Sequence, residues 1–255
     1  MNPAYARQYA DFERWHWWFR GRRSILETVL RRELGVGRAR TIVSLGCGPA
    51  EGLAWLAALA GPGGRVVGID ADPTHAQPAA PGVALVVARM EAPPLHAGVA
   101  DAVLGLDVLE HIADDAHGLA EAARLVRPRG LLLVTVPALP SLWGAQDEAN
   151  HHLRRYTKTT LRAAFARAGL PAPRVSYFNT LLFPPVAAVR WARRGLGAQG
   201  EVRSDFEDNR PGLANDILTR VFALERHLVH RLPMPIGVSL LAVARRTGAD
   251  VRAAG

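Results

Sequence analysis

The sequence predicts a doubly wound α/β fold built on a largely parallel sheet. Short apolar runs rich in Val, Ile and Leu alternate with stretches of helical character. Several runs are apolar throughout, which is typical of strands that helices cover on both faces. The chain has 255 residues, 49% of them apolar and 21% charged, so it can bury a sizeable core.

The first half of the chain contains most of the expected elements. Strands are predicted at 41–46, 64–70, 83–88, within 100–112, and at 131–137. A helix is expected at 52–61, and another at 116–130, where Pro128 and Gly130 supply stop signals. Ligands of such folds bind beyond the carboxyl ends of the strands. The same edge is therefore where a site is expected here.

After Pro137 the alternation of apolar runs and helical stretches is less regular. Residues 157–170 are predicted to be a helix with Thr157 as its N-cap. Strands are expected at 174–179 and, last in the chain, at 239–246. Between them lie an apolar piece, a polar loop and one more helical stretch.

Composition limits the classes of partner. The net charge is +8, but the arginines are scattered, so we expect no nucleic acid. Cys47 is the only cysteine, which excludes an internal disulfide and a four-cysteine metal site. We see neither a signal peptide nor an apolar run of about 18 residues, and therefore expect a cytoplasmic protein of a bacterium-like cell.

The stretch VSLGCGPAEG, residues 43–52, predicts a glycine turn after a buried strand. Gly46 and Gly48 would bare backbone N–H groups to a ligand. Asp70 ends the next strand, 22 residues after Gly48, where a carboxylate can accept both ribose hydroxyls. A glycine turn and an acid at this spacing fit a site for NAD or S-adenosylmethionine. The alternative that the turn is only a tight connection and Asp70 a solvated residue at the strand end also remains open.

Further motifs favour the second cofactor. LDVLEHI at 106–112, with VSLGCG, VVGID and GLLLVTVP, resembles the class I S-adenosylmethionine-dependent methyltransferases. The flanks ERWHWWFRGRR (13–23) and DEANHHLRRYT (147–157) resemble a bacterial subgroup of that family. The resemblance implies a Rossmann-like sheet of seven strands, mostly parallel, whose last strand is antiparallel.

The resemblance also implies roles for individual residues. The backbone of Gly46, Cys47 and Gly48 would line the methionine part of the cofactor, and Asp70 would hold the ribose. Cofactor contacts further along the chain would come from Ala71 and Met90 at the adenine and from Asp107 and Val108 at the sulfonium and substrate entrance.

Two positions depart from the family pattern. Ser44 replaces the usual acid of the glycine motif, and Arg89 stands where many relatives carry an Asp that accepts from the adenine amino group. Arginine cannot accept a hydrogen bond. Losing one such bond costs about 1–3 kcal/mol, which weakens cofactor binding without abolishing it.

His111 is the predicted general base, with Asp107 beside it at the reaction centre. Two alternatives stay open: Glu110 and His111 as helix-capping residues, and a divalent cation held by Glu110, His111 and Asp107. We expect no metal. The acceptor is predicted to contact His152, Arg155 and Tyr156, with Arg155 as an anion clamp, unless Asp147 and Arg155 form an interior ion pair instead.

We treat residues 1–255 as one methyltransferase domain. It would comprise an N-terminal helical lid at 1–38, a cofactor-binding core at 39–140, and a substrate-side part at 141–255 with an insertion at 180–235. In the lid, Trp15, Trp18 and Phe19 would share a helix face, either packing on the sheet or closing the cleft with His16 and Arg20 facing inward.

Residues 178–194 are apolar and then basic, which suits a membrane-surface element or a helix that covers the sheet. The predicted activity is methyl transfer (EC 2.1.1.-) from S-adenosylmethionine to a small-molecule or lipid-linked acceptor, hydrophobic or related to the cell envelope. Peripheral contact with the inner face of the membrane is one option. The alternatives are a non-catalytic binding module of the same fold and an NAD-dependent oxidoreductase.

Overall fold

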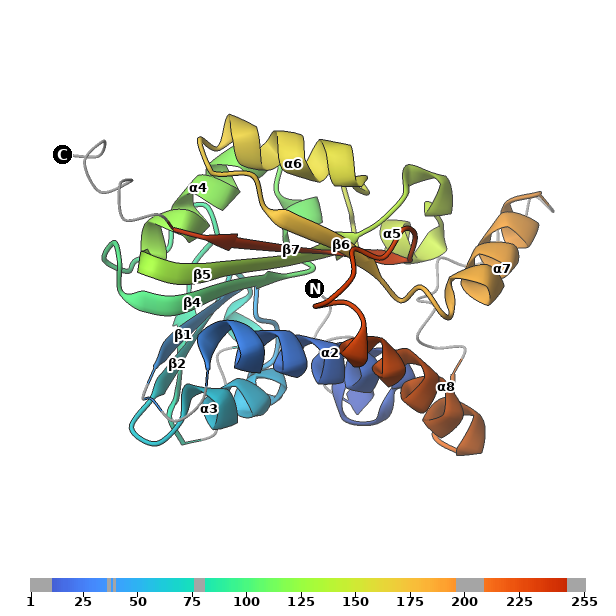
Figure 1. Ribbon diagram of the computed structural model, residues 1–255, viewed down its shortest axis with the longest axis horizontal. Coiled ribbons are helices and arrows are strands. Elements are labelled where there is room, and N and C mark those ends of the chain that lie inside the picture. The colour runs from blue at the N-terminus through green and yellow to red at the C-terminus, as the bar shows by residue number, and fades with distance from the viewer. Residues whose placement is uncertain (1–10, 36–37, 39, 76–80, 196–208, 247–255) are drawn as a thin grey trace.

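A computed structural model describes residues 11–35, 38, 40–75, 81–195 and 209–246. These residues form one sheet with helices on both faces (Figure 1). Residues 1–10 of the expected lid and 196–208 of the expected insertion lie outside the described residues.

The sheet has seven strands in the order β3-β2-β1-β4-β5-β7-β6. The strands are β1 (Thr41–Leu45), β2 (Arg65–Asp70), β3 (Val83–Val87), β4 (Ala100–Leu106), β5 (Val126–Pro137), β6 (Arg174–Phe178) and β7 (Ser239–Arg245). Only β7 is antiparallel to its neighbours, β5 and β6. The predicted fold class and the antiparallel last strand are thereby confirmed.

Helices form a layer on each face of the sheet (Figure 1). They are α2 (Trp17–Leu34), α3 (Ala54–Ala60), α4 (Asp115–Leu125), α5 (Ala145–Ala149), α6 (Lys158–Arg167), α7 (Phe183–Gly195) and α8 (Leu213–Leu224). α4 and α6 cover one face, and α2 and α3 cover the other, with α8 beside α2. The structure contains no helix, within the described ranges, that is long and apolar enough to cross a membrane.

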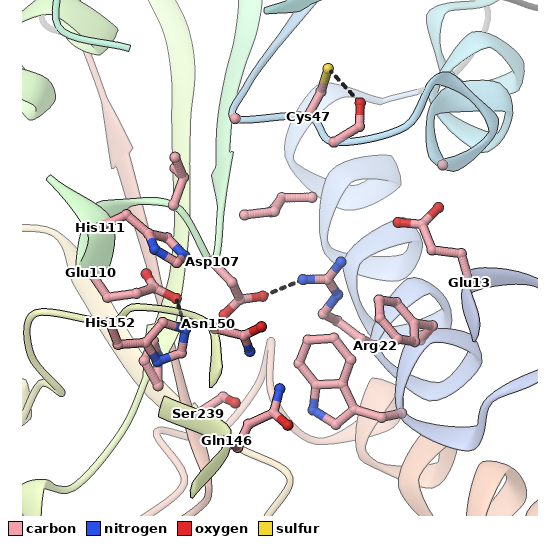
Figure 2. Close-up of a pocket in the computed structure, with 18 of the residues that line it drawn as sticks. Glu13, Arg22, Cys47, Asp107, Glu110, His111, Gln146, Asn150, His152 and Ser239 are labelled. Carbon is pink, nitrogen blue, oxygen red and sulfur yellow. Dashed lines mark hydrogen bonds and ion pairs between the residues drawn. The ribbon is translucent and has the colours of Figure 1, made fainter. Parts of the chain in front are cut away.

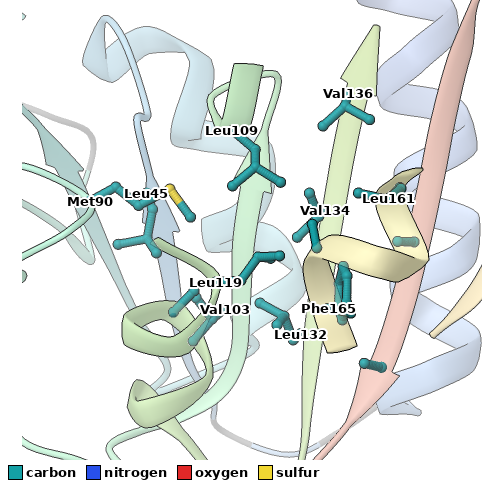
Figure 3. Close-up of a cluster of buried hydrophobic side chains, with 14 of the residues drawn as sticks. Leu45, Met90, Val103, Leu109, Leu119, Leu132, Val134, Val136, Leu161 and Phe165 are labelled. Carbon is teal, nitrogen blue, oxygen red and sulfur yellow. The ribbon is translucent and has the colours of Figure 1, made fainter. Parts of the chain in front are cut away.

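Each face has its own apolar core. Under α4 and α6, buried side chains such as Leu119, Leu132 and Phe165 interdigitate (Figure 3). Under α2 and α3, Ile25, Leu56 and their neighbours form the second core. Burying one such side chain contributes about 1.5–3 kcal/mol, so the two cores fix the strand ends on which the site stands.

Helix α2 is joined to α8, about 200 residues further along the chain. A side chain at Gly21 would overlap the ring of Phe222, so glycine is what allows the two helices to pack this closely. The Asn215 side chain donates to Trp15 O and accepts from Trp17 N at 2.8 Å. His16 caps α2, its Nδ1 accepting from Trp18 N, so the aromatic segment is interrupted there and is not the continuous helix expected.

One predicted boundary is wrong. The helix expected at 116–130 ends at Leu125, and residues 126–130 belong to β5. Val126 pairs with Ala100, and Pro128 could not have continued the helix. The expected N-cap at Thr157 is confirmed, because its hydroxyl accepts from Thr160 N.

Candidate functional site

A cavity of about 720 Å³ lies at the carboxyl ends of the strands. Its volume falls in the range of small-molecule sites, about 300–1,000 Å³. The glycine turn and the ends of β2 and β4 line one part, and the loop after β5, α7 and the end of β6 line another, with α2 between them. Figure 2 shows the side chains that converge on it.

The glycine turn after β1 takes a left-handed backbone. Gly46 has φ 59° and Gly48 has φ 62°, a region that costs other residues about 1–2 kcal/mol. A side chain at Gly46 would meet Val108, with the added Cβ only 2.7 Å from Val108 Cβ, whereas one at Gly48 would meet no atom of the described residues within 4 Å. The turn therefore packs against the end of β4 at Gly46 and opens at Gly48.

The Asp70 carboxylate lies across this turn. It accepts from Gly48 N at 2.8 Å and Asp72 N at 2.9 Å, and Oδ1 is 3.0 Å from His75 Nδ1. Burial alone would raise the pKa of Asp70, but these hydrogen bonds lower it overall. The hydrogen bond to the Asp70 carboxylate in turn raises the pKa of His75. Asp70 and the turn thus face a common cavity, as the sequence predicted.

The wall after β3 carries Met90, Arg89 and Glu91. Met90 is 4% exposed and packs mostly into the core, and like Ala71 it lines the cavity. Arg89 turns outward and binds Glu91 at 2.6 Å. The other Glu91 oxygen, Oε2, is buried and has no hydrogen-bond partner among the described residues. Glu91 therefore keeps an acceptor oxygen without a described partner beside Arg89, and the sequence analysis did not single it out.

Cys47 lies within the turn, between Gly46 and Gly48, and its side chain is partly buried. Burial, and then the Asp70 charge, raise the pKa of Cys47 to about 12. The thiol is therefore protonated at neutral pH and acts as an apolar contact rather than a nucleophile.

Asp107 follows β4 with φ 55° and pairs with Arg22 of α2 (Figure 2). The Arg22 guanidinium also lies 4.4 Å from the centre of the Trp18 ring. This pair connects the N-terminal helix to the centre of the cavity. His16 lines the cavity as expected, but the prediction for Arg20 is wrong, because it turns away and binds Asp216.

Three groups of acid–base character meet at the other end of the cavity: Glu110, His111 and His152 (Figure 2). Glu110 is fully buried, and burial and the Asp107 charge raise its pKa well above the usual range. His111 is accessible from the cavity, yet loss of surrounding water and the neighbouring His152 lower its pKa. The imidazole of His111 is therefore neutral at physiological pH.

The segment after α5 is held by a buried ion pair. Asp147 accepts from Arg155 Nε and lies close to His152 Nδ1, each at 2.8 Å, and Arg155 also donates to Ala138 O. Arg155 lines the cavity, but its guanidinium serves the interior pair, which favours the structural alternative over an anion clamp. Tyr156 does not line the cavity, since its hydroxyl donates to Asp115 in the core.

Uncharged polar side chains line the same end of the cavity as Glu110 and His111. Asn179 is 1% exposed, and neither atom of its side-chain amide has a hydrogen-bond partner among the described residues. Gln146, Asn150 and Ser239 line the same end (Figure 2). The sequence analysis missed Asn179, although its place directly after β6, at the carboxyl edge of the sheet, was a usable signal.

Comparisons with known proteins agree with this geometry. Residues 43–134 match the family described as a methyltransferase domain. The trans-aconitate 2-methyltransferase of Azoarcus is 31% identical over 196 residues, which cover 68% of this chain and 74% of that protein. A protein of Mycobacterium tuberculosis, named as a probable S-adenosylmethionine-dependent methyltransferase, is 30% identical over 50% of this chain and 45% of its own.

A solved geranyl diphosphate methyltransferase with bound S-adenosylmethionine has the same fold, with a TM-score of 0.56. It is 20% identical and matches 88% of this chain and 85% of its own. Apart from the Azoarcus enzyme, the alignments span 35% to 46% of the length of the curated relatives.

The chain belongs to the class I S-adenosylmethionine-dependent methyltransferases. Its cofactor is S-adenosylmethionine. The residues fit that group: an open glycine turn at Gly48, a carboxylate across it, and a buried acceptor at Glu91 all face one cavity. Family membership also decides between the two cofactors that the turn admitted, and the NAD alternative is set aside.

Proposed function

We propose that the chain transfers the methyl group of S-adenosylmethionine to an acceptor bound at the end of the cavity that Glu110, His111, His152 and Asn179 line. The observation that carries the proposal is the continuity of one cavity from the glycine turn and Asp70 to this end. When bound, the cofactor supplies a methyl group activated by a positively charged sulfur.

The residues of the turn hold the cofactor in this proposal. Gly46, Cys47 and Gly48 line the methionine part, Asp70 binds the ribose, and Ala71 and Met90 flank the adenine. The Asp107 carboxylate favours a positive charge at the centre of the cavity, where it pairs with Arg22.

His111 is proposed to act on the acceptor proton. A neutral imidazole at the cavity wall can take a proton from a hydroxyl or amine as the new bond forms. His152 stands beside it, with ring centres 4.8 Å apart, so the pair defines where the reacting acceptor atom lies.

A hydrophobic acceptor with a polar head suits the remaining walls. Leu182, just before α7, and Val186 and Val189 within it line the cavity, as do Trp17 and Trp18 of α2. The named substrates of the relatives, trans-aconitate and geranyl diphosphate, differ in polarity, so the acceptor class rests on these walls. A lipid-linked or cell-envelope molecule would place its chain along α7.

Contact with a membrane surface remains a prediction tied to α7. Trp191, at 49% exposure, and the basic Arg193 lie on this helix beside the cavity. Sedimentation with anionic lipid vesicles tests it. Binding that a Trp191→Ala variant loses would support the contact, and a chain that stays in the supernatant would remove it.

Calorimetry with S-adenosylhomocysteine tests the proposed function. We expect binding, and we expect Asp70→Ala to weaken it tenfold or more, since a partly buried carboxylate contact is lost. Asp216→Ala, which removes an exposed carboxylate paired with Arg20, is the matched control and should bind normally.

Turnover is measured as conversion of S-adenosylmethionine to S-adenosylhomocysteine with a panel of hydroxylated small molecules and a bacterial lipid extract. His111→Ala should lose turnover and keep cofactor binding; full activity would demote His111 to a structural residue. No binding at millimolar cofactor would favour the remaining alternative, a non-catalytic module of this fold.

A further inference from the structure

Glu110 has an unusual environment for a carboxylate. Its side chain is fully buried, and neither oxygen has a hydrogen-bond partner among the described residues. An uncompensated buried charge is strongly unfavourable, so such groups are paired, protonated or bound to a metal. Among the described residues, the one ion-pair contact of Glu110 within 4.0 Å is with His152, whose Nε2 lies 3.9 Å from Oε1, while the charges of Asp107, Arg155 and Asp147 act on Glu110 from further away.

Two imidazoles converge on that carboxylate. One ligand atom from each of Glu110, His111 and His152 lies within 4.8 Å of the others. Ligands about 2.0–2.2 Å from a central cation are themselves roughly 3–4.5 Å apart, so small side-chain rotations would bring all three into coordination.

The arrangement is held by its surroundings. Asp147 Oδ1 lies 2.8 Å from His152 Nδ1, which leaves Nε2 of the same ring on the side of Glu110. A carboxylate behind the outer nitrogen is the usual support of a metal-binding histidine. Leu153 N donates to Glu110 O at 2.9 Å, which ties the two segments together through the main chain.

From this geometry we infer that Glu110, His111 and His152 form a site for one divalent transition-metal ion at the acceptor end of the cavity. Two imidazoles and one carboxylate suit Zn²⁺, Fe²⁺ or Co²⁺ better than Mg²⁺, which prefers oxygen ligands. Asp107, which the sequence suggested as a third ligand, binds Arg22 instead, and His152 takes its place.

A metal ion at this site would favour methyl acceptors that carry a hydroxyl group, an inference that rests on the proposed function. Three protein ligands leave coordination positions open toward the cavity, where an acceptor hydroxyl could bind and become more acidic. Its proton would pass to solvent water. The oxygen would keep the electron pair that forms the bond to the methyl carbon, while the carbon–sulfur bond breaks with its pair left on sulfur. His111 would then serve as a ligand rather than as a free base.

Cobalt binding by the tag-free chain, stripped with EDTA, tests the site directly. We expect one Co²⁺ per chain, visible absorption bands, and displacement by Zn²⁺ but not by Mg²⁺. Glu110→Gln should weaken Co²⁺ binding by at least about 100-fold, because it removes the only charged ligand while keeping the shape. His151→Asn, an exposed neighbour with left-handed φ, is the matched control and should bind as the wild type does.

A melting experiment separates the metal site from an ordinary protonated acid. Zn²⁺ should raise the melting temperature of the wild type and of His151→Asn, and should leave Glu110→Gln unchanged. If Glu110→Gln does not fold, His152→Ala replaces it with the same expectation. Absence of stoichiometric Co²⁺ binding by the wild type, or equal binding by the folded variants, would overturn the site.

The same samples, titrated with S-adenosylhomocysteine, keep the two proposals distinct. Cofactor binding without metal binding would overturn the metal site alone. Metal binding without cofactor binding would overturn the proposed methyl transfer and leave the metal site in place.

Discussion

Asp70 at one end of the cavity differs from Glu110 and Asn179 at the other end in how its polar atoms are satisfied by hydrogen bonds. At the cofactor end, the Asp70 carboxylate already bonds to Gly48 N, Asp72 N and His75. At the acceptor end, the carboxylate of Glu110 and the amide of Asn179 are buried without hydrogen bonds among the described residues. The Asp70 carboxylate is therefore fixed in advance, although Glu91 at the same end keeps one buried oxygen without a partner among the described residues. The polar atoms of Glu110 and Asn179 would find their partners on a ligand.

The largest effect is expected from Gly46→Ala. The new methyl would overlap Val108, and alanine would have to take a left-handed backbone, so the two costs add to about 2–5 kcal/mol. Gly48→Ala carries only the backbone cost, about 1–2 kcal/mol, because no atom in the described part of the chain lies within 4 Å of its added Cβ. Urea unfolding measures the free energy of unfolding of both variants. Equal decreases would show that Gly46 is not packed against Val108 as closely as the structure indicates.

A smaller, pH-dependent effect is expected from His75→Gln. The Asp70 carboxylate raises the pKa of His75 above 6.5, so the pair stabilises the fold below that pH and this stabilisation is lost as pH rises through the raised pKa. The Asp70 contribution, with a lowered pKa, is lost only when pH falls below about 4. The pair is therefore strongest between these limits.

When the pH is raised from 5.5 to 8.5, the free energy of unfolding of the wild type should accordingly fall by about 1 kcal/mol more than that of His75→Gln. Urea unfolding at the two pH values measures both. Comparison with the variant removes the pH dependence that the other histidines contribute to both proteins. Parallel losses in the two proteins would mean that the His75–Asp70 contact does not strengthen the cofactor end.

The smallest effect is expected at the acceptor end, from Asn179→Gly. Glycine keeps the left-handed φ of 57°, and the removed amide makes no hydrogen bond with any residue that the structure describes. The free energy of unfolding should therefore fall by no more than about 1 kcal/mol, the entropic cost of glycine. S-adenosylhomocysteine affinity should not change. A loss of several kcal/mol would mean that Asn179 supports the fold and would remove the contrast between the two ends.

The sequence predicted the cofactor end better than the acceptor end, for a physical reason. Gly46, Gly48 and Asp70 sit at fixed places in consecutive β-α units, so local pattern places them together. His152 reaches Glu110 only through the path of the chain after β5, which no periodicity encodes. The break of the aromatic segment at His16 likewise depends on Asn215, far away in sequence.

The start of β5 was missed because residues 126–130 satisfy two patterns. Val126 continues the apolar stripe of α4, while its pairing with Ala100 depends on the neighbouring strand. Arg155 and Tyr156 were predicted to contact the acceptor because they are polar and densely spaced, yet Asp147 and Asp115 hold them in the interior.

The position of β7 has a consequence for biosynthesis. The strand β7, the last of the described sheet along the chain, lies between β5 and β6, which are both synthesised before it. Until residue 245 has emerged, those two strands present unpaired edges that invite pairing with other chains. A chain cut short before residue 239 should therefore aggregate rather than persist as a smaller folded protein.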